Sequence, residues 1–246
     1  MRLNMEEKQN PKKKSKKIII GVVILVIIIA CIIAFLAVPE IQDQKQQEIL
    51  LDEIEAVSQK TIGEDNFNTE IKTSGDYAKV ESTIKNYLQK YSDAVKAVMD
   101  ETENIQSLEG TTEKSELENK KAEIQEMQET VDVKIQTLID MTSEDYIKNL
   151  IEKENLDQKY VDLYNQIMVE DVTTTLKDAQ ETMTTMKEKI NQVFDLAVEC
   201  YDYLIDHINS WETQNGQIMF YSEAELEEYN QLVENLQNKA TELENM

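Results

Sequence analysis

The sequence has few of the residues that break helices or cross-link a fold. Its 246 residues include five glycines, two prolines and two cysteines. This scarcity of glycine and proline, with abundant Glu, Lys, Gln and Leu, argues against a turn-rich β fold and predicts an all-α protein. Cys31 lies inside an apolar run and Cys200 is alone after it. An intrachain disulfide in the part that follows the run is therefore excluded, and packing must supply its stability.

Residues that would carry catalysis or bind a metal ion are equally scarce. The one histidine, His207, follows Cys200 by one heptad on an apolar helix face, but structural zinc needs four ligands, and no further Cys or His follows the run. We expect His207 either to pair with a carboxylate such as Asp206 or to lie at the end of the bundle. The sequence contains no calcium loop, phosphate loop or marked nucleophile. We therefore expect a non-enzymatic protein with no cofactor and no metal.

One uncharged run is long enough to cross a membrane. Residues 18–38 include sixteen Ile, Val, Leu or Phe residues, and as a helix they would span roughly 31 Å, the thickness of the hydrocarbon core. Five lysines at positions 12–17 precede the run, whereas Glu40 and Asp43 follow it. Because positive flanks stay cytoplasmic, we predict a cytoplasmic tail at 1–17, a bilayer-spanning anchor at 18–38 and an extracytoplasmic C-terminal domain.

An alternative anchor is a lipid on Cys31. The stretch "IIAC" that ends at Cys31 resembles the lipobox of a lipoprotein signal, and residues 18–30 have the length of a signal peptide's apolar region. The sequence stays apolar for seven residues after Cys31, however, whereas a lipoprotein normally becomes polar there. The retained single-pass anchor is the interpretation we favour.

Charge is distributed very unevenly along the chain. The residues before the predicted anchor are basic, whereas the remainder carries 18 basic and 47 acidic residues, a net charge of −29. Such a surface repels nucleic acid and anionic lipid, so we expect no nucleic-acid partner. A protein partner, or a neutral or cationic ligand, is more compatible with it.

Hydrophobic periodicity predicts about five helices after the anchor, packed as an antiparallel bundle or coiled-coil-like array. We assign residues 39–75 to a membrane-proximal helix and loop, and residues 76–246 to the exported bundle. The two clearest early repeats are a seam from Tyr77 to Val98 and a heptad series from Leu117 to Leu138. A short link joins these two segments, which predicts a helical hairpin.

Three further helices are predicted in the second half of the chain. The first begins at an N-cap on Ser143 and runs to a phase slip near Glu170 and Asp171. The second is a forty-residue seam at 172–211, and the last follows Ser222, which has capping-box spacing to Glu225. Between them, Asn215-Gly216 is a strong turn signal. We favour an irregular loop there over a small hairpin that pairs 211–213 with 218–220.

Aromatic residues gather around this turn. Four of them are candidate partner-binding residues: Trp211, Phe220, Tyr221 and Tyr229. Aromatic groups at the end of a bundle either cap its core or form a binding surface, and capping is the commoner role. Trp211 ends the apolar seam, so we expect a buried indole packed by Phe220 and Tyr229, whereas Tyr221 is expected to be exposed.

These observations predict a membrane-tethered, extracytoplasmic helical interaction or binding module in the cell membrane. The basic flank, and a composition rich in Ile, Lys, Glu and Asn, favour a bacterial protein. Two alternatives remain: a receptor for a small ligand, and a lipoprotein anchored through Cys31. The identity of the partner and the oligomeric state do not follow from the sequence.

Overall fold

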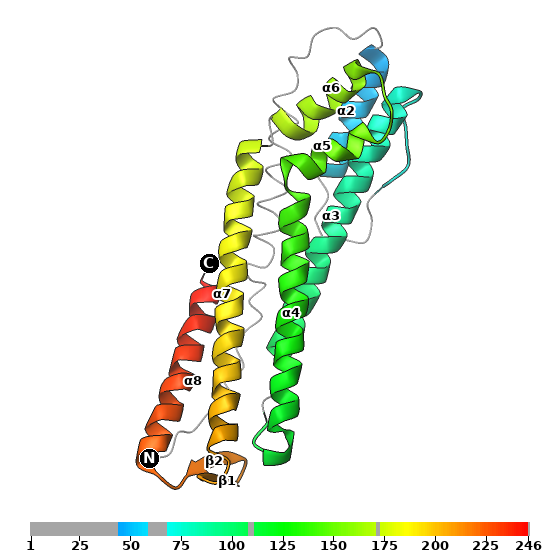
Figure 1. Ribbon diagram of the computed structural model, residues 1–246. Helices are drawn as coiled ribbons and strands as arrows, with labels where there is room; N and C mark the ends of the chain where they lie inside the picture. Colours follow the sequence, from blue (N-terminus) through cyan, green and yellow to red (C-terminus); the bar gives the residue numbers. More distant parts are fainter. Residues whose placement is uncertain (1–43, 59–67, 108–110, 171–172, 246) are drawn as a thin grey trace.

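The computed structural model describes residues 44–58, 68–107, 111–170 and 173–245, which form an elongated and mostly helical domain with one small β-hairpin (Figure 1). The predicted cytoplasmic tail, the predicted span at 18–38 and Cys31 lie outside the described residues. Within the described ranges, no helix combines the length and the apolar character needed to cross a membrane.

The described residues contain seven α-helices rather than about five. The elements in chain order are α2 (Gln44–Ser58), α3 (Asp76–Ser107), the 3-10 turn η2 (Lys114–Glu116), α4 (Leu117–Met141), α5 (Glu144–Glu152), α6 (Gln158–Asn165), the π-helical turn η3 (Gln166–Glu170), α7 (Thr173–Asp206), β1 (Trp211–Gln214), β2 (Gln217–Phe220) and α8 (Glu223–Glu244).

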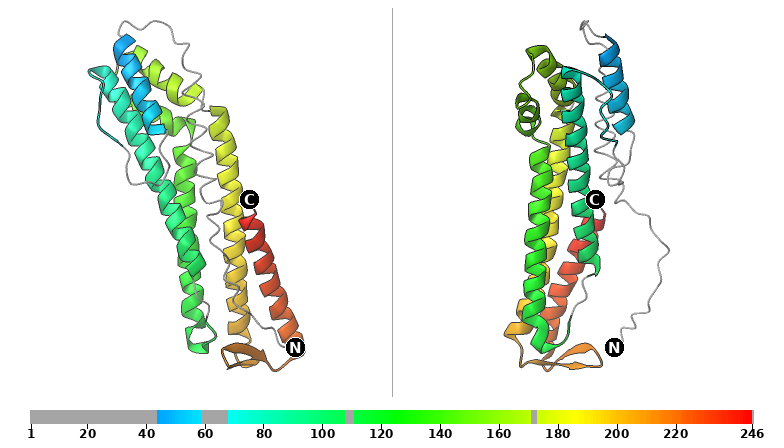
Figure 2. Two further views of the ribbon diagram at one scale, coloured as in Figure 1. Left: turned by 180° about the vertical axis from the view of Figure 1, so that it is seen from behind. Right: turned by 90° about the vertical axis from the view of Figure 1, so that its right-hand side faces the viewer.

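The predicted α3–α4 helical hairpin is confirmed. The two helices run antiparallel along the length of the molecule, and α7 lies beside α4 (Figures 1 and 2). Residues of the predicted heptad series in α4 are buried, as are most of the predicted seam residues in α3, because a 3,4 spacing places apolar side chains on one helix face. The buried members are Tyr77, Val80, Ile84, Tyr87, Tyr91 and Val98 in α3, and Leu117, Ile124, Val131 and Leu138 in α4.

The predicted long helix at 172–211 is present as α7, but its end and one of its core positions differ from the prediction. The described helix has 34 residues and ends at Asp206. Ala179, Met183 and Ile190 are buried as expected, but Phe194 is buried where the seam placed Val193, which is only partly buried. The larger ring therefore occupies the core position. Helix α8 packs along α7 and has no fully buried residue in its described part, so it covers α7 from outside.

The prediction of a single helix between Ser143 and Glu170 is wrong, because the helical path is interrupted between α5 and α6. Ser143 caps α5 as expected, accepting a hydrogen bond from the Tyr146 amide at 3.2 Å. After α5, Asn155 adopts a left-handed φ of 50°, which ends the helical path, and α6 begins at Gln158. The Tyr164 hydroxyl donates to the Ile147 carbonyl at 3.0 Å and joins α6 to α5. The turn η3 lies where the phase slip was predicted.

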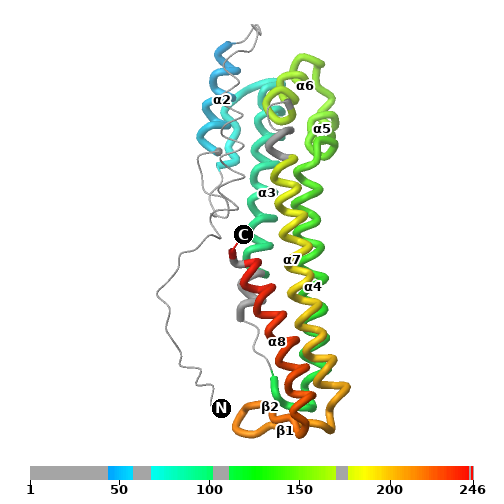
Figure 3. The backbone as a smooth tube through the Cα atoms, turned by 90° about the vertical axis from the view of Figure 1, so that its left-hand side faces the viewer, coloured from blue at the N-terminus to red at the C-terminus, as the bar shows by residue number. Residues whose placement is uncertain are grey.

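The two ends of the molecule are built differently. Helices α2, α5 and α6 gather with the start of α3 at one end, which we call the α2 end. The opposite end consists of the β-hairpin, the last turns of α7, the first turns of α8, and η2 with the start of α4, and we call it the hairpin end. Gln44, the first described residue, belongs to the α2 end, so the described chain starts far from the hairpin (Figures 2 and 3).

Candidate functional site

A two-stranded hairpin forms the turn between α7 and α8, so the predicted irregular loop is wrong. Strands β1 and β2 pair antiparallel, with Trp211 opposite Phe220 and Glu212 opposite Met219. Asn215 and Gly216 take φ values of 54° and 74°, and two positive φ angles match the type I′ turn that follows the natural twist of a hairpin. The Asn-Gly dipeptide was therefore the decisive signal, although each strand has only four residues.

Trp211 anchors the hairpin to the bundle. Its side chain is fully buried, and the indole Nε1 donates a hydrogen bond of 2.9 Å to the Leu204 carbonyl at the end of α7. Leu117 and Leu204 complete a small core around it. The Lys114 ammonium lies 4.5 Å from the centre of the indole ring and donates to the Trp211 and Ile208 carbonyls. The position of the hairpin is thus fixed by apolar, cation–π and hydrogen-bond contacts together.

A second layer of rings supports the hairpin from the side of α8. Tyr203 packs against Phe220 and Tyr229 with centroid separations of 6.0 Å, and Phe220 lies 5.4 Å from Tyr229. The Tyr203 hydroxyl makes a bifurcated hydrogen bond of 3.0 Å to the Glu225 carbonyl and the Glu228 carboxylate. The pKa of Tyr203 is raised to about 12, mainly by desolvation and secondly by the hydrogen bond to Glu228. This layer joins α7, β2 and α8.

The four aromatic candidates meet at this end but have different roles. Trp211 is buried as expected, and the half-buried Phe220 and Tyr229 pack against its cluster. Tyr221 is 67% exposed, although its backbone amide donates to the Ser210 carbonyl at 2.8 Å. Three of the candidates therefore cap the core, and only Tyr221 presents its ring to solvent.

Two further exposed apolar residues lie within five positions of Tyr221 in the sequence. Met219, in β2, is 45% exposed. Its cross-strand partner is Glu212, whose carboxylate lies 3.4 Å from the hydroxyl of Tyr221, the residue directly after β2. Leu226, in the first turn of α8, is 38% exposed. Sequence reasoning missed both residues, because residues 218–221 are all apolar and no polar–apolar alternation marks which of them are exposed. We name the group of Glu212, Met219, Tyr221, Glu223 and Leu226 the hairpin surface.

Acidic residues dominate the hairpin end. Between Lys189 and Lys239 the sequence has ten acidic residues and no Lys or Arg. The Tyr221 hydroxyl lies 3.4 Å from the Glu212 carboxylate, and desolvation together with this carboxylate raises the tyrosine's pKa. Two lysines from elsewhere in the sequence reach this region, Lys114 as described above and Lys121, which pairs with Asp202. Both are engaged in contacts within the chain.

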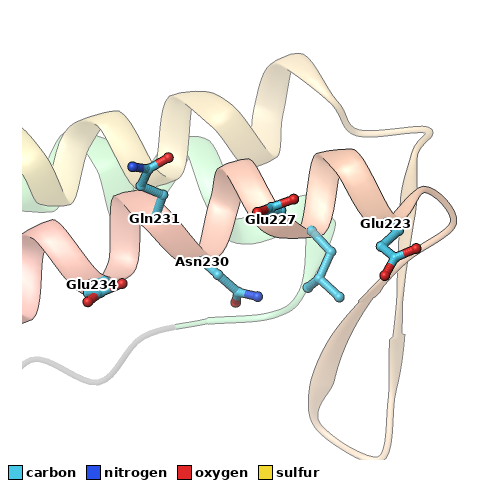
Figure 4. Close-up of a pocket in the computed structure, with 6 residues that line it drawn as sticks. Glu223, Glu227, Asn230, Gln231 and Glu234 are labelled. Carbon is cyan, nitrogen blue, oxygen red and sulfur yellow. The ribbon is translucent and has the colours of Figure 1, made fainter.

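A shallow hollow of about 540 Å³ lies along the outward face of α8 (Figure 4). Its six lining residues all belong to this helix: Glu223, Leu226, Glu227, Asn230, Gln231 and Glu234. Figure 4 shows Glu223 beside the hairpin and Glu234 farther along the helix. The hollow is a feature of one exposed helix face, continuous with the hairpin surface through Glu223 and Leu226.

The described residues form no candidate metal centre. Burial raises the pKa of the Cys200 thiol to about 11. The predicted pairing of His207 with Asp206 is not what the geometry gives. The histidine Nδ1 lies 2.9 Å from the Tyr203 carbonyl, to which it donates, and its ring stacks on the Tyr203 ring at 4.2 Å.

A buried ion pair at the α2 end was not recognised from the sequence. Glu81 is fully buried and Lys85 is 1% exposed, and they are joined at 2.6 Å. Lys85 also donates to the Glu53 carboxylate and the Glu70 carbonyl, each at 2.7 Å. Glu81 accepts from the backbone amides of Lys72 and Thr73 and from the Thr73 hydroxyl.

This network joins α2, and the segment at 70–73 that precedes α3, to the bundle. Every partner of the Glu81 carboxylate is a donor, and every partner of the Lys85 ammonium is an acceptor. Burial raises the pKa of Glu81, but the hydrogen bonds from Lys85, Thr73 and Lys72 outweigh it and hold that pKa below its ordinary value. We assign the cluster a structural role, since Glu81 and Lys85 are buried and their partners are all within the chain.

A known protein family matches most of the chain. A family described as "Protein of unknown function (DUF3053)" matches residues 42–246. The chain belongs to the DUF3053 family. The matched region takes in every described element from α2 to α8, hairpin included. No curated protein and no solved structure is significantly similar to the chain, so membership of the DUF3053 family adds no activity or ligand to the geometry given above.

Proposed function

We propose that this protein is a membrane-tethered, extracytoplasmic interaction module that presents its hairpin end to a protein partner. In this proposal, residues 18–38 span the bilayer once, the basic tail stays in the cytoplasm, and the protein is not an enzyme. One observation carries the proposal: the exposed hairpin surface lies at the end of the molecule opposite to Gln44, the first residue of α2.

The position of Gln44 determines which end would face the membrane. Five residues separate Val38, the end of the proposed span, from Gln44, and five residues extend at most about 18 Å. The α2 end would therefore stay close to the bilayer. Helix α7 has 34 residues, which corresponds to a length of about 51 Å. The hairpin end would accordingly be held tens of ångströms from the lipid surface, where a partner can reach it.

The long helices suit this role. The heptad spacing in α3, α4 and α7 favours coiled-coil-like packing, which makes a stiff spacer between the membrane and the hairpin end. The small-ligand receptor has less support, because the hollow along α8 is lined by one face of one helix, whereas ligand sites are mostly concave and enclosed. A lipid on Cys31 would change the anchor without changing which end is presented.

Site-specific photo-crosslinking in cells tests the proposal. A photoreactive residue replaces Met219 in the full chain. The matched control replaces Val133, which is 63% exposed and lies on α4 about 24 Å along the helix from Leu117, the α4 residue that packs in the Trp211 cluster. We expect a discrete crosslinked protein from position 219 that is absent from position 133 and is lost when Tyr221→Ala is added. Equal products from both positions, or none from position 219, would refute the proposal.

A further inference from the structure

We propose that the partner contacts the hairpin surface through a cationic segment, in which Lys or Arg side chains flank an apolar residue. This inference rests on the proposed function, since it specifies the chemistry of the partner for the same surface. Two features of the hairpin end carry it: uncompensated negative charge and an apolar centre whose backbone is fixed.

The negative charge of the hairpin surface is not neutralised by salt bridges among the described residues. Glu212 and Glu223 lie on the hairpin surface and are exposed, and Glu227 continues the acidic face along α8. None of these three carboxylates has a salt bridge to a lysine or arginine within the described ranges. Lys114 contacts the indole and carbonyls of the hairpin instead, and Lys121 is paired with Asp202. Cationic side chains of a partner would supply the missing charge.

The apolar centre consists of Met219 in β2 and Tyr221, the residue directly after β2. The backbone of Tyr221 is fixed by its hydrogen bond to Ser210 and by the preceding residue Phe220, which pairs with the buried Trp211. Binding would therefore order only the side chains, and this small entropic cost favours affinity. Tyrosine also combines a large apolar surface with a hydroxyl, as residues that dominate interfaces often do.

Other occupants fit this surface less well. A second copy of the chain would bring the same excess of carboxylates to the contact, because a two-fold interface uses one patch twice. Anionic lipid would be repelled in the same way. A cationic protein segment satisfies both the charge and the apolar centre.

Peptide binding to the full chain in nanodiscs of zwitterionic lipid tests this inference. The probe is a fluorescent amphipathic peptide of Lys and Leu, and the comparison peptides replace every Lys by Glu or every Leu by Ser. The variants are Glu212→Gln, Glu223→Gln and Tyr221→Ala. Matched controls are Glu129→Gln and Val133→Ala, which change an exposed carboxylate and an exposed apolar residue on α4.

We expect the Lys/Leu peptide to bind more tightly than either comparison peptide, with an affinity that falls as salt is added. Tyr221→Ala should weaken binding about tenfold, and each Glu→Gln change on the hairpin surface about two- to fivefold. The two control variants should leave affinity unchanged. Equal losses in control and hairpin variants, tight binding of the Glu/Leu peptide, or self-association lost with Tyr221→Ala would each overturn the inference. A specific crosslink from position 219 alongside such a result would leave the proposed function standing.

Discussion

Replacing Glu81 by Gln is expected to destabilise the domain strongly, although the change removes only one charge. Glu81 receives Lys85 on one oxygen at 2.6 Å, and the Thr73 amide and hydroxyl on the other at 2.8 and 2.7 Å. In either orientation of the new amide, its NH₂ group faces donors, so at least one buried group loses its acceptor. Breaking a buried ion pair by removing one partner costs about 3–5 kcal/mol. The Lys85–Glu53 contact remains, which places our expectation near about 3 kcal/mol.

Urea unfolding of the full chain in mild detergent, followed by circular dichroism at 222 nm, measures this loss as a lower transition midpoint. The matched control is Glu242→Gln, which breaks the exposed pair with Lys239 on α8 and should leave the transition midpoint nearly unchanged. The wild-type stabilisation from Glu81 should also depend on pH, because its folded pKa is lowered. It is fully present above the unfolded pKa of about 4.3 and is lost as pH falls through the folded value. A Glu81→Gln cost equal to that of the control would refute the reasoning.

The remaining predictions concern buried groups elsewhere. Phe220→Ala should cost about 1–3 kcal/mol in the same unfolding assay, less than a fully buried ring, because Phe220 is half-buried; a loss above this range would mean a tighter hairpin. The Tyr91 hydroxyl is buried without a hydrogen-bond partner in the described structure, so Tyr91→Phe should leave stability unchanged or raise it, whereas Tyr164→Phe removes the bond to α5 and should cost about 1 kcal/mol. Equal effects of these two changes would contradict the assigned bonds. Cys200 should react with iodoacetamide slowly near pH 7 and rapidly in urea, since burial raises its pKa to about 11; fast native alkylation would show an open thiol.

Long periodic segments made much of this fold predictable. The seams of α3 and α4 repeat over many turns, so errors at single positions average out. The break after α5 was missed because it depends on the left-handed φ of one residue, Asn155. The hairpin was underrated because its strands are too short for alternation to outweigh the loop interpretation.

The buried ion pair could not be found from local sequence. Glu81 and Lys85 are four residues apart on a helix, which is the spacing of ordinary exposed pairs. Their burial results from α2 and residues 70–73 folding over them, and this is a tertiary event. The candidate site was predictable only in part. Composition indicated an aromatic end, but only the folded hairpin distinguishes the exposed Tyr221 from the buried Trp211.

The central claim is that the hairpin end is displayed outside the cell, away from the membrane. The most direct test is labelling of Met219→Cys in the full chain with a membrane-impermeant maleimide added to intact, wall-stripped cells. The background should be low because Cys200 is buried and Cys31 lies in the predicted span. We predict labelling at position 219 before lysis, whereas Asn10→Cys in the basic tail should react only after lysis. Labelling of Asn10→Cys in intact cells, with position 219 reacting only after lysis, would contradict the account.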